Sequence, residues 1–305
     1  MQVLIRSAKR WPDTDEERTG MMMKDLPLNV DFTGRVAVVT GAGGILCSCM
    51  ARALAKAGAK VALLDLNEEA VLKIAEEIRA DGCEAIGVKC NVLDEESIRQ
   101  AHEQVLGSFG KTNILLNGAG GNNPRATTTS EVFSKDQLGN EVTFYDLTKE
   151  GFQFVFDINF TGAFLVTKEF TQDMTDGGEN TVLNIASVNT WLPLTKIPAY
   201  AAAKEALGNF TKWMAMYFSG VGIRVNAIAP GFLSTYQTKP LWYEKDGVTP
   251  TERLSKIIEG TPMKRLGEPE ELFGAVLFLL DSKAAGFITG AVLPVDGGYT
   301  AYSGV

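Results

Sequence analysis

The chain has 305 residues, 45% of them apolar and 22% charged, with a formal net charge of −8. This length suffices for one α/β domain with a large buried core. An acidic protein is repelled by phosphate backbones and anionic lipids, and no apolar run approaches the ~20 residues that cross a bilayer, so neither nucleic acid nor a membrane is expected as a partner.

Residues 1–30 are predicted to be a partly disordered N-terminal extension, followed by a single catalytic domain over residues 31–305. Residues 1–20 are polar, of mixed charge, and lack the apolar core of a secretory signal. They are either a disordered leader or sequence upstream of a start at Met21. Acidic residues such as Asp13 and Glu16 disfavour a mitochondrial leader, so the expected location is cytoplasmic.

The four cysteines and the single histidine argue against two kinds of site. Cys47, Cys49, Cys83 and Cys90 form no C-x-x-C pair, so no metal site is predicted and reduced thiols are expected. A lone histidine argues against a Ser-His-Asp hydrolase. His102 lies among polar residues of a predicted helix, where a solvated surface position is expected.

Short apolar runs alternate with helical patterns from residue 35 onward. Strands are predicted at 36–40, 61–64, 85–90, 114–117, 182–186, 223–228 and 292–295, and helices at 50–57, 67–82, 94–109, 199–218 and 268–280. Apolar strands without polar alternation are typical of sheets that are covered on both faces. The pattern therefore predicts an α/β fold, a single-domain Rossmann-type doubly wound parallel sheet with helices on both faces.

Two long segments interrupt the alternation, an insert at 121–149 and a loop at 231–265. Both follow the carboxyl ends of strands, where open α/β sheets bind ligands. Long segments in a compact domain are usually functional or disordered. We expect substrate lids, with surface decoration as the alternative.

Residues 40–44 read Thr-Gly-Ala-Gly-Gly and lie between the first strand and the first helix. Glycines there let the backbone approach a pyrophosphate at a helix N-terminus. Asp65 closes the second strand, where a carboxylate binds an adenosine ribose and repels the 2′-phosphate of NADP. No Lys or Arg at 42–49 or 66–67 offsets this charge. NAD is therefore the expected cofactor, and an Asp that merely caps a turn is the alternative.

Tyr200 and Lys204 stand four residues apart in the predicted helix 199–218, on one helical face. Free tyrosine titrates near ~10, too high for a general base at neutral pH. A nearby ammonium, together with the positive nicotinamide of NAD+, stabilises the phenolate. Ser187 at the end of a strand can hold the substrate oxygen. By itself the Tyr-x-x-x-Lys spacing is a common surface pair, and the other motifs give it meaning.

In this combination the sequence resembles the short-chain dehydrogenase/reductase family over residues 33–305. The motifs that carry the resemblance are the turn at 40–44, Asn-Gly-Ala-Gly at 117–120, Asp-Ile-Asn-Phe at 157–160, Ser187, Tyr200, Lys204, Pro-Gly at 230–231 and Asp-Gly-Gly at 296–298. The resemblance implies hydride transfer without a metal, and usually a homotetramer.

The resemblance also implies a catalytic tetrad. Ser187 would orient the substrate and Tyr200 would transfer the proton. Lys204 would lower the pKa of Tyr200 and bind ribose, and Asn159 would hold a relay water. The implied cofactor-binding residues are Gly41, Gly43, Gly44, Ile45, Asp65, Leu66, Asn91, Val92, Asn117, Gly118, Ala119, Tyr200, Lys204, Pro230, Gly231, Leu233 and Thr235.

The sequence departs from the family pattern at two places. The family turn usually carries glycine at the positions of Ile45 and Cys47, whereas here glycines stand earlier, at 43 and 44. The third family glycine allows close helix–strand packing, so that packing must be rearranged. The usual Asn-Asn-Ala-Gly has Gly118 as its second residue.

At these departures and in several other segments the sequence resembles one subgroup of the family, the bacterial D-mannonate oxidoreductases, also called fructuronate reductases. The resemblance lies in residues 41–47, 120–128, 152–157, 193–200 and 301–305. The subgroup reduces the ketone of D-fructuronate to the alcohol of D-mannonate. Alternatives are a gluconate-type acid, a polyol or a 3-oxoacyl thioester as substrate, and, more remotely, a catalytically silent NAD-binding protein.

A sugar acid requires a cationic or N–H-rich pocket for its carboxylate. Lys196, predicted one helical turn before Tyr200, and Arg125 in the insert are the candidate cations, unless both are solvated surface charges. The expected substrate-binding residues are Asn123, Arg125, Ser187, Asn189, Lys196 and Tyr200.

Overall fold

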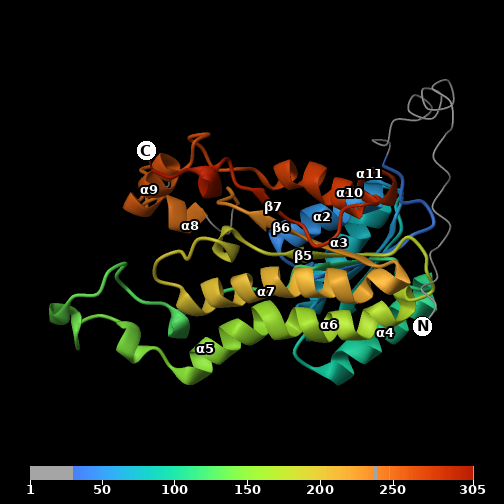
Figure 1. Cartoon of the computed structure of the whole chain (residues 1–305), viewed down its shortest axis with the longest axis horizontal. Helices are drawn as coiled ribbons and strands as arrows, with labels where there is room; N and C mark the ends of the chain where they lie inside the picture. Colours follow the sequence, from blue (N-terminus) through green and yellow to red (C-terminus); the bar gives the residue numbers. More distant parts are fainter. Residues whose placement is uncertain (1–29, 236–238, 247, 305) are drawn as a thin grey trace.

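The computed structural model describes residues 30–235, 239–246 and 248–304, so the predicted extension at 1–30 lies, apart from Val30, outside the described residues. One parallel sheet of seven strands runs through this part of the chain in the order β3-β2-β1-β4-β5-β6-β7 (Figure 1). The strands are β1 (Val36–Thr40), β2 (Lys60–Asp65), β3 (Ala85–Lys89), β4 (Ile114–Asn117), β5 (Thr181–Ile185), β6 (Arg224–Pro230) and β7 (Val292–Val295). The predicted fold class is confirmed.

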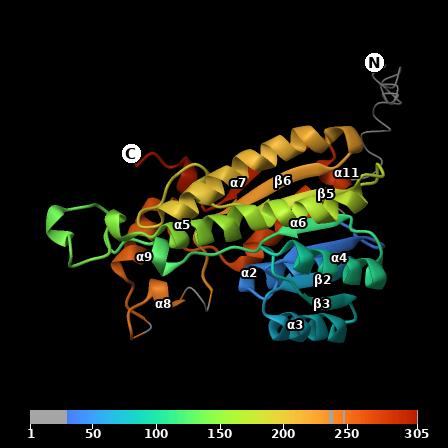
Figure 2. The same cartoon turned by 90° about the horizontal axis from the view of Figure 1, so that it is seen from below.

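Helices cover both faces of the sheet (Figures 1 and 2). The helices of the described residues are α2 (Ile45–Lys56), α3 (Glu68–Ala80), α4 (Glu95–Phe109), α5 (Lys149–Phe156), α6 (Gly162–Phe170), α7 (Pro198–Tyr217), α8 (Lys239–Trp242), α9 (Glu252–Gly260), α10 (Phe273–Leu280) and α11 (Ser282–Ala285). Buried side chains of α2, α3 and α10 pack on one face, and those of α4, α6 and α7 on the other. Among the described residues, no helix combines the length and apolarity needed to cross a membrane.

Strand β1 shows why its sequence lacks polar alternation. Val36 and Val38 face the α4, α6 and α7 layer, whereas Ala37 and Val39 face the α2, α3 and α10 layer. All four are at most 3% exposed. Burying one aliphatic side chain of valine size stabilises a fold by roughly 1.5–3 kcal/mol, so a central strand benefits from apolar residues at every position.

Helix α2 begins at Ile45, whereas the sequence predicted a start at residue 50. The predicted start was late because the N-cap residue is Gly44, which has no side chain to accept a hydrogen bond from the first turn. The usual cap signal of Ser, Thr, Asp or Asn is therefore missing. The predicted cap of α3 is confirmed, since the Asn67 side chain accepts a hydrogen bond from the Ala70 N–H at 3.2 Å.

The two long segments differ in structure. Residues 121–149 contain, before the start of α5, only the short 3-10 turns η1 (Pro124–Ala126), η2 (Lys135–Gln137) and η3 (Phe144–Asp146). Residues 231–265 carry α8 and α9 and are thus more ordered than a bare loop. In both views the insert and the α8–α9 segment lie at the same end of the molecule (Figures 1 and 2).

His102 is not solvated as expected from the sequence. Its side chain is only 12% exposed, with Nδ1 2.8 Å from a carboxylate oxygen of Glu169 and Nε2 2.9 Å from one of Asp173. The two acids lie on α6 and on the following turn, so the residue joins α4 to α6 within one layer. Burial opposes the charge, but the two carboxylates prevail and raise the pKa of His102. The sequence around His102 is polar and gives no sign of this burial, because the two acids that contact it lie far away in the sequence.

The charged His102 is expected to stabilise the fold in a pH-dependent way. Its pKa is raised in the folded state, so this contribution is fully present below about pH 6.5 and is lost as pH rises through the folded pKa. His102→Asn should lower the free energy of unfolding by about 1–3 kcal/mol at pH 6. Urea unfolding of both proteins at pH 6 and pH 9 measures the difference. An equal loss at both values would contradict the charge-based explanation.

Candidate active site

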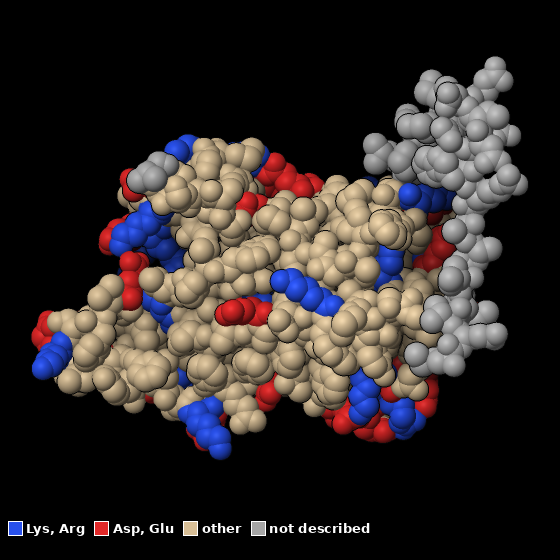
Figure 3. All heavy atoms as spheres, in the orientation of Figure 1, with Lys and Arg blue, Asp and Glu red and all other residues tan. Residues whose placement is uncertain are grey.

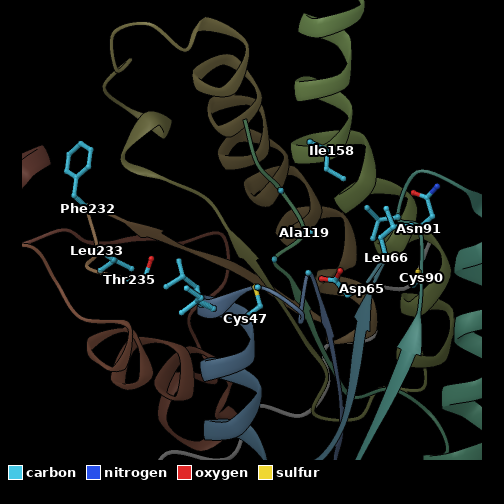
Figure 4. A pocket seen from close by; sticks show the side chains of 18 of the residues that line it. Cys47, Asp65, Leu66, Cys90, Asn91, Ala119, Ile158, Phe232, Leu233 and Thr235 are labelled. Carbon is cyan, nitrogen blue, oxygen red and sulfur yellow. The ribbon is translucent and has the colours of Figure 1, made fainter. Parts of the chain in front are cut away.

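A cleft of about 510 Å³ opens at the carboxyl ends of the central strands. Asp65, Leu66 and Asn91 lie toward one end, and Leu233 and Thr235 toward the other (Figure 4). The residues that line it are Gly41, Gly44, Ile45, Leu46, Cys47, Asp65, Leu66, Cys90, Asn91, Val92, Gly118, Ala119, Gly120, Ile158, Gly231, Phe232, Leu233, Thr235 and Trp242. Its mixed walls and elongated arrangement suit a dinucleotide.

The turn after β1 brings a helix N-terminus to this cleft. Gly41 has a φ of 67°, and a Cβ there would lie 2.8 Å from the backbone of Ala119, so only glycine fits. The first turn of α2 has no acidic residue, and its N-cap makes no side-chain hydrogen bond. An open helix N-terminus of this kind binds the phosphates of a cofactor.

Asp65 is held at its end of the cleft by the turn itself. Its two carboxylate oxygens accept hydrogen bonds from the Gly43 N–H at 3.0 Å and the Asn67 N–H at 2.9 Å. A Cβ on residue 43 would lie 2.9 Å from the Asp65 carboxyl carbon, which explains the shifted glycine. No Lys or Arg is among the described residues that line the cleft. The residues present therefore fit NAD and leave the 2′-phosphate of NADP without a cationic partner.

Replacing Asp65 should change the cofactor preference. Asp65→Asn removes a charged hydrogen-bond acceptor for ribose, which is worth roughly 1.5–3 kcal/mol or about 10- to 150-fold in kcat/KM with NADH. The same change removes the repulsion of a 2′-phosphate, so kcat/KM with NADPH should rise. Steady-state kinetics with both cofactors give the ratio. A ratio equal to that of the wild type would exclude Asp65 as the discriminating residue.

Cys47 and Gly118 explain the rearranged helix–strand packing. Cys47 stands where the family usually has glycine, and its side chain occupies the space that Gly118 leaves open. A Cβ on residue 118 would lie 2.2 Å from the Cys47 Sγ. Burial raises the pKa of the Cys47 thiol to about 12, so the thiol is a neutral packing group. The two departures from the family pattern are thus complementary.

Most of the predicted cofactor residues line the cleft. Five of the predicted set do not appear on its wall, namely Gly43, Asn117, Tyr200, Lys204 and Pro230. Asn117 is buried, and its amide donates to Thr167 and Asn184, both at 2.9 Å. The sequence reasoning missed Leu46, Cys47, Cys90, Gly120, Ile158, Phe232 and Trp242. Several of these residues are next to predicted cofactor residues in the sequence, and this position is the signal that could have identified them.

Helix α7 brings the predicted proton-transfer pair together. The Lys204 Nζ lies 5.6 Å from the centre of the Tyr200 ring and donates a 2.8 Å hydrogen bond to the Ile185 carbonyl at the end of β5. A Cβ on Gly120 would lie 2.5 Å from Asn159 Oδ1 and 3.4 Å from Lys204 Nζ. These residues therefore surround one point beside the cleft.

The electrostatics of this pair differ from the sequence expectation. Burial raises the pKa of the Tyr200 phenol, and its hydrogen bond with Ser187 opposes that rise. Burial also lowers the pKa of Lys204 to about 8. Burial thus prevails over the hydrogen bond with Ser187, and Tyr200 is a neutral phenol at neutral pH. Such a group is suited to donate a proton to a ketone.

Asn159 lies where helix α5 passes through a π-helical turn, η4 (Asp157–Thr161), into α6. Its Nδ2 donates to the carbonyls of Gly121 at 2.6 Å and Val155 at 2.8 Å, and its Oδ1 accepts from the Gly121 N–H at 3.2 Å. The side chain thus anchors the start of the insert. Its role in holding a relay water stays a prediction.

Ser187 and Asn189 form a buried pair after β5. The Ser187 Oγ accepts hydrogen bonds from the Asn189 N–H at 3.3 Å and Nδ2 at 3.1 Å. The Asn189 Oδ1 accepts from the Leu194 N–H at 3.0 Å. Asn189 was expected to bind a substrate hydroxyl, but at 3% exposure it connects Ser187 to the next loop.

The other predicted substrate residues are placed differently from the expectation. Lys196 precedes α7, as the predicted helix start at residue 199 implies, and its φ of 72° lies in the left-handed region. Arg125 is exposed on η1. The Asn123 side chain accepts from the Arg125 N–H at 2.9 Å and caps that turn. Among the described residues, no three His, Cys, Asp or Glu side chains form a cluster that could hold a metal.

Comparison with known proteins agrees with this geometry. A family model described as enoyl-(acyl carrier protein) reductase matches residues 43–300. Proteins of Haemophilus influenzae and Bacillus subtilis, both named uncharacterized oxidoreductases, are 50% and 47% identical; the alignments cover 92% of this chain and 98% and 100% of theirs. A crystal structure from Haemophilus influenzae, provisionally named a D-mannonate oxidoreductase and holding NAD, has a TM-score of 0.89 at 49% identity over 92% of this chain and 100% of that one.

The chain belongs to the short-chain dehydrogenase/reductase family and is an oxidoreductase. The family, fold class, enzyme class and nicotinamide cofactor predicted from the sequence are thereby confirmed.

Proposed function

We propose that the enzyme interconverts D-fructuronate and D-mannonate with NAD(H). The observation that carries this proposal is the likeness to the Haemophilus influenzae structure provisionally named for D-mannonate oxidoreductase activity and holding NAD. The Asp65 carboxylate and the absence of Lys or Arg among the described cleft-lining residues support NAD over NADP.

The proposed roles follow from the geometry on α7 and β5. Bound NADH supplies the hydride. Tyr200, kept protonated by burial, donates the proton to the carbonyl oxygen, and the Ser187 hydroxyl orients that oxygen. The Lys204 ammonium stabilises the phenolate that Tyr200 becomes once it has given up its proton, and it binds the cofactor ribose. In the reverse direction the positive nicotinamide and the Lys204 ammonium together favour the phenolate.

The test is a comparison of two keto-acids. We expect NADH oxidation by the purified enzyme to be faster with D-fructuronate than with 5-ketogluconate, measured as kcat/KM. Faster turnover of 5-ketogluconate would favour the gluconate-type alternative. An enzyme that binds NADH but turns over neither acid, no polyol and no 3-oxoacyl thioester would be a silent NAD-binding protein.

We also propose a cytoplasmic homotetramer. All four cysteines are free, which suits a reducing compartment. The face over α6 and α7 carries few charged side chains (Figure 3). Phe164, Trp213 and Tyr217 on this face are 42%, 47% and 65% exposed. Such a patch is typical of a subunit interface. Sedimentation equilibrium should give the mass of four chains.

A further inference from the structure

A second cavity of about 180 Å³ adjoins the cleft on the side of α9. It is lined by Glu131, Leu194, Thr195, Phe232, Arg253, Lys256, Ile257 and Tyr299. Phe232 also lines the cleft, and its ring is turned away from Leu233 and Thr235 (Figure 4). Leu194 is bonded to Asn189, which in turn contacts Ser187. The cavity is therefore next to the predicted reaction point but outside the space of the cofactor.

Two cations line this cavity, and their environments differ. Lys256 Nζ lies 3.2 Å from Glu131 and 2.9 Å from Glu252, so its charge is matched by acids. The Nε of Arg253, by contrast, is a buried donor without an acceptor among the described residues. A buried charged donor left unpaired is costly, and a bound water, ion or ligand group satisfies such a donor.

The local structure fixes Arg253 in place. The Thr251 side chain caps α9 by accepting from the Leu254 N–H at 3.2 Å. Leu254 and Ile257 on the same helix are buried against Trp242. Arg253 stands between Thr251 and Leu254 in the sequence and is half-buried. The packing of α9 therefore fixes its backbone, while its side chain lines the cavity.

We propose that Arg253 binds the carboxylate of the sugar-acid substrate, an inference that rests on the proposed function. D-Fructuronate carries its carboxylate at the end of the carbon chain remote from the ketone. A substrate whose ketone lies at Tyr200 and Ser187 must therefore place the acid in an adjoining space. A guanidinium presents a planar fork that matches a carboxylate. Arg253 thus takes the role that the sequence suggested for Lys196 or Arg125.

The experiment compares Arg253→Gln with Lys73→Gln and Lys196→Gln. Loss of a charged hydrogen bond should lower kcat/KM for D-fructuronate about 10- to 150-fold in Arg253→Gln, mainly through a higher KM. The affinity for NADH, measured by fluorescence, and the melting temperature should stay at wild-type values. Lys73→Gln, which removes an exposed cation on α3 that lines neither the cleft nor this cavity, should retain wild-type activity, whereas Lys196→Gln tests the competing cation. Arg253→Lys keeps the charge without the fork and should lie between the wild type and Arg253→Gln.

Two failures are distinguishable. If the wild type reduces D-fructuronate and Arg253→Gln does so equally well, or if Lys196→Gln alone loses the substrate, the assignment of Arg253 is overturned and the proposed function stands. If the wild type does not reduce D-fructuronate at all, the proposed function fails, and the assignment fails with it.

Discussion

Tyr200→Phe should lose turnover by about 10²–10⁴-fold and still bind NADH, because general acid catalysis contributes this much to a proton transfer. The phenol is the group that the structure keeps protonated next to Ser187 and Lys204. The ring itself packs against Ala126 and Ala199, and phenylalanine preserves these contacts. The loss should therefore fall on kcat, with little change in stability. Stopped-flow or steady-state NADH oxidation and a fluorescence titration measure the two effects.

Tyr217→Phe is the matched control for this experiment. It makes the same chemical change on the same helix, at a side chain that is 65% exposed. Its turnover should equal that of the wild type. If Tyr200→Phe retained wild-type turnover, Tyr200 would not be the proton donor, and a different group in the cleft would have to supply the proton.

The sheet was predictable because its determinants are local. Strands β1, β4 and β7 agree with the predicted ranges, since each is a short apolar run bounded by turn residues, and β1 and β4 are buried throughout. The start of α3 was predictable because Asn67 is a residue type whose side chain caps helices. The start of α2 carried no such signal, because Gly44 caps it without a side chain. The helical ends are therefore less readable than the strands they connect.

Contacts within the site were predictable where the residues are close in sequence. They were less predictable where the fold brings distant segments together. Tyr200 and Lys204 share a helical face by spacing. The partners of His102 stand on another helix, and Arg253 reaches its cavity through the packing of α9. Lys196 was favoured because it is near Tyr200 in sequence. Its left-handed backbone just before α7 could not be predicted from that proximity.

Gly118→Ala is expected to be a strongly disruptive small change in the cleft. The added Cβ would lie 2.2 Å from the Cys47 Sγ, far inside the van der Waals contact distance. Overpacking of this kind destabilises a protein by about 1–3 kcal/mol. Because both residues line the cofactor cleft, NADH binding should weaken as well. Urea unfolding and a fluorescence titration with NADH report the two losses.

A double-mutant cycle with Cys47→Ala identifies the cause. Removing the sulfur takes away the atom that the new methyl group would meet, so the double variant should recover much of the stability, with a coupling energy of about 0.5–3 kcal/mol. Recovery should be incomplete, since the same Cβ also approaches the Thr40 carbonyl to 3.0 Å. Gly107→Ala is the control, because a Cβ there meets nothing within 4 Å. A coupling energy near zero would mean that Cys47 and Gly118 do not compensate each other, and the packing of α2 against β4 would require another explanation.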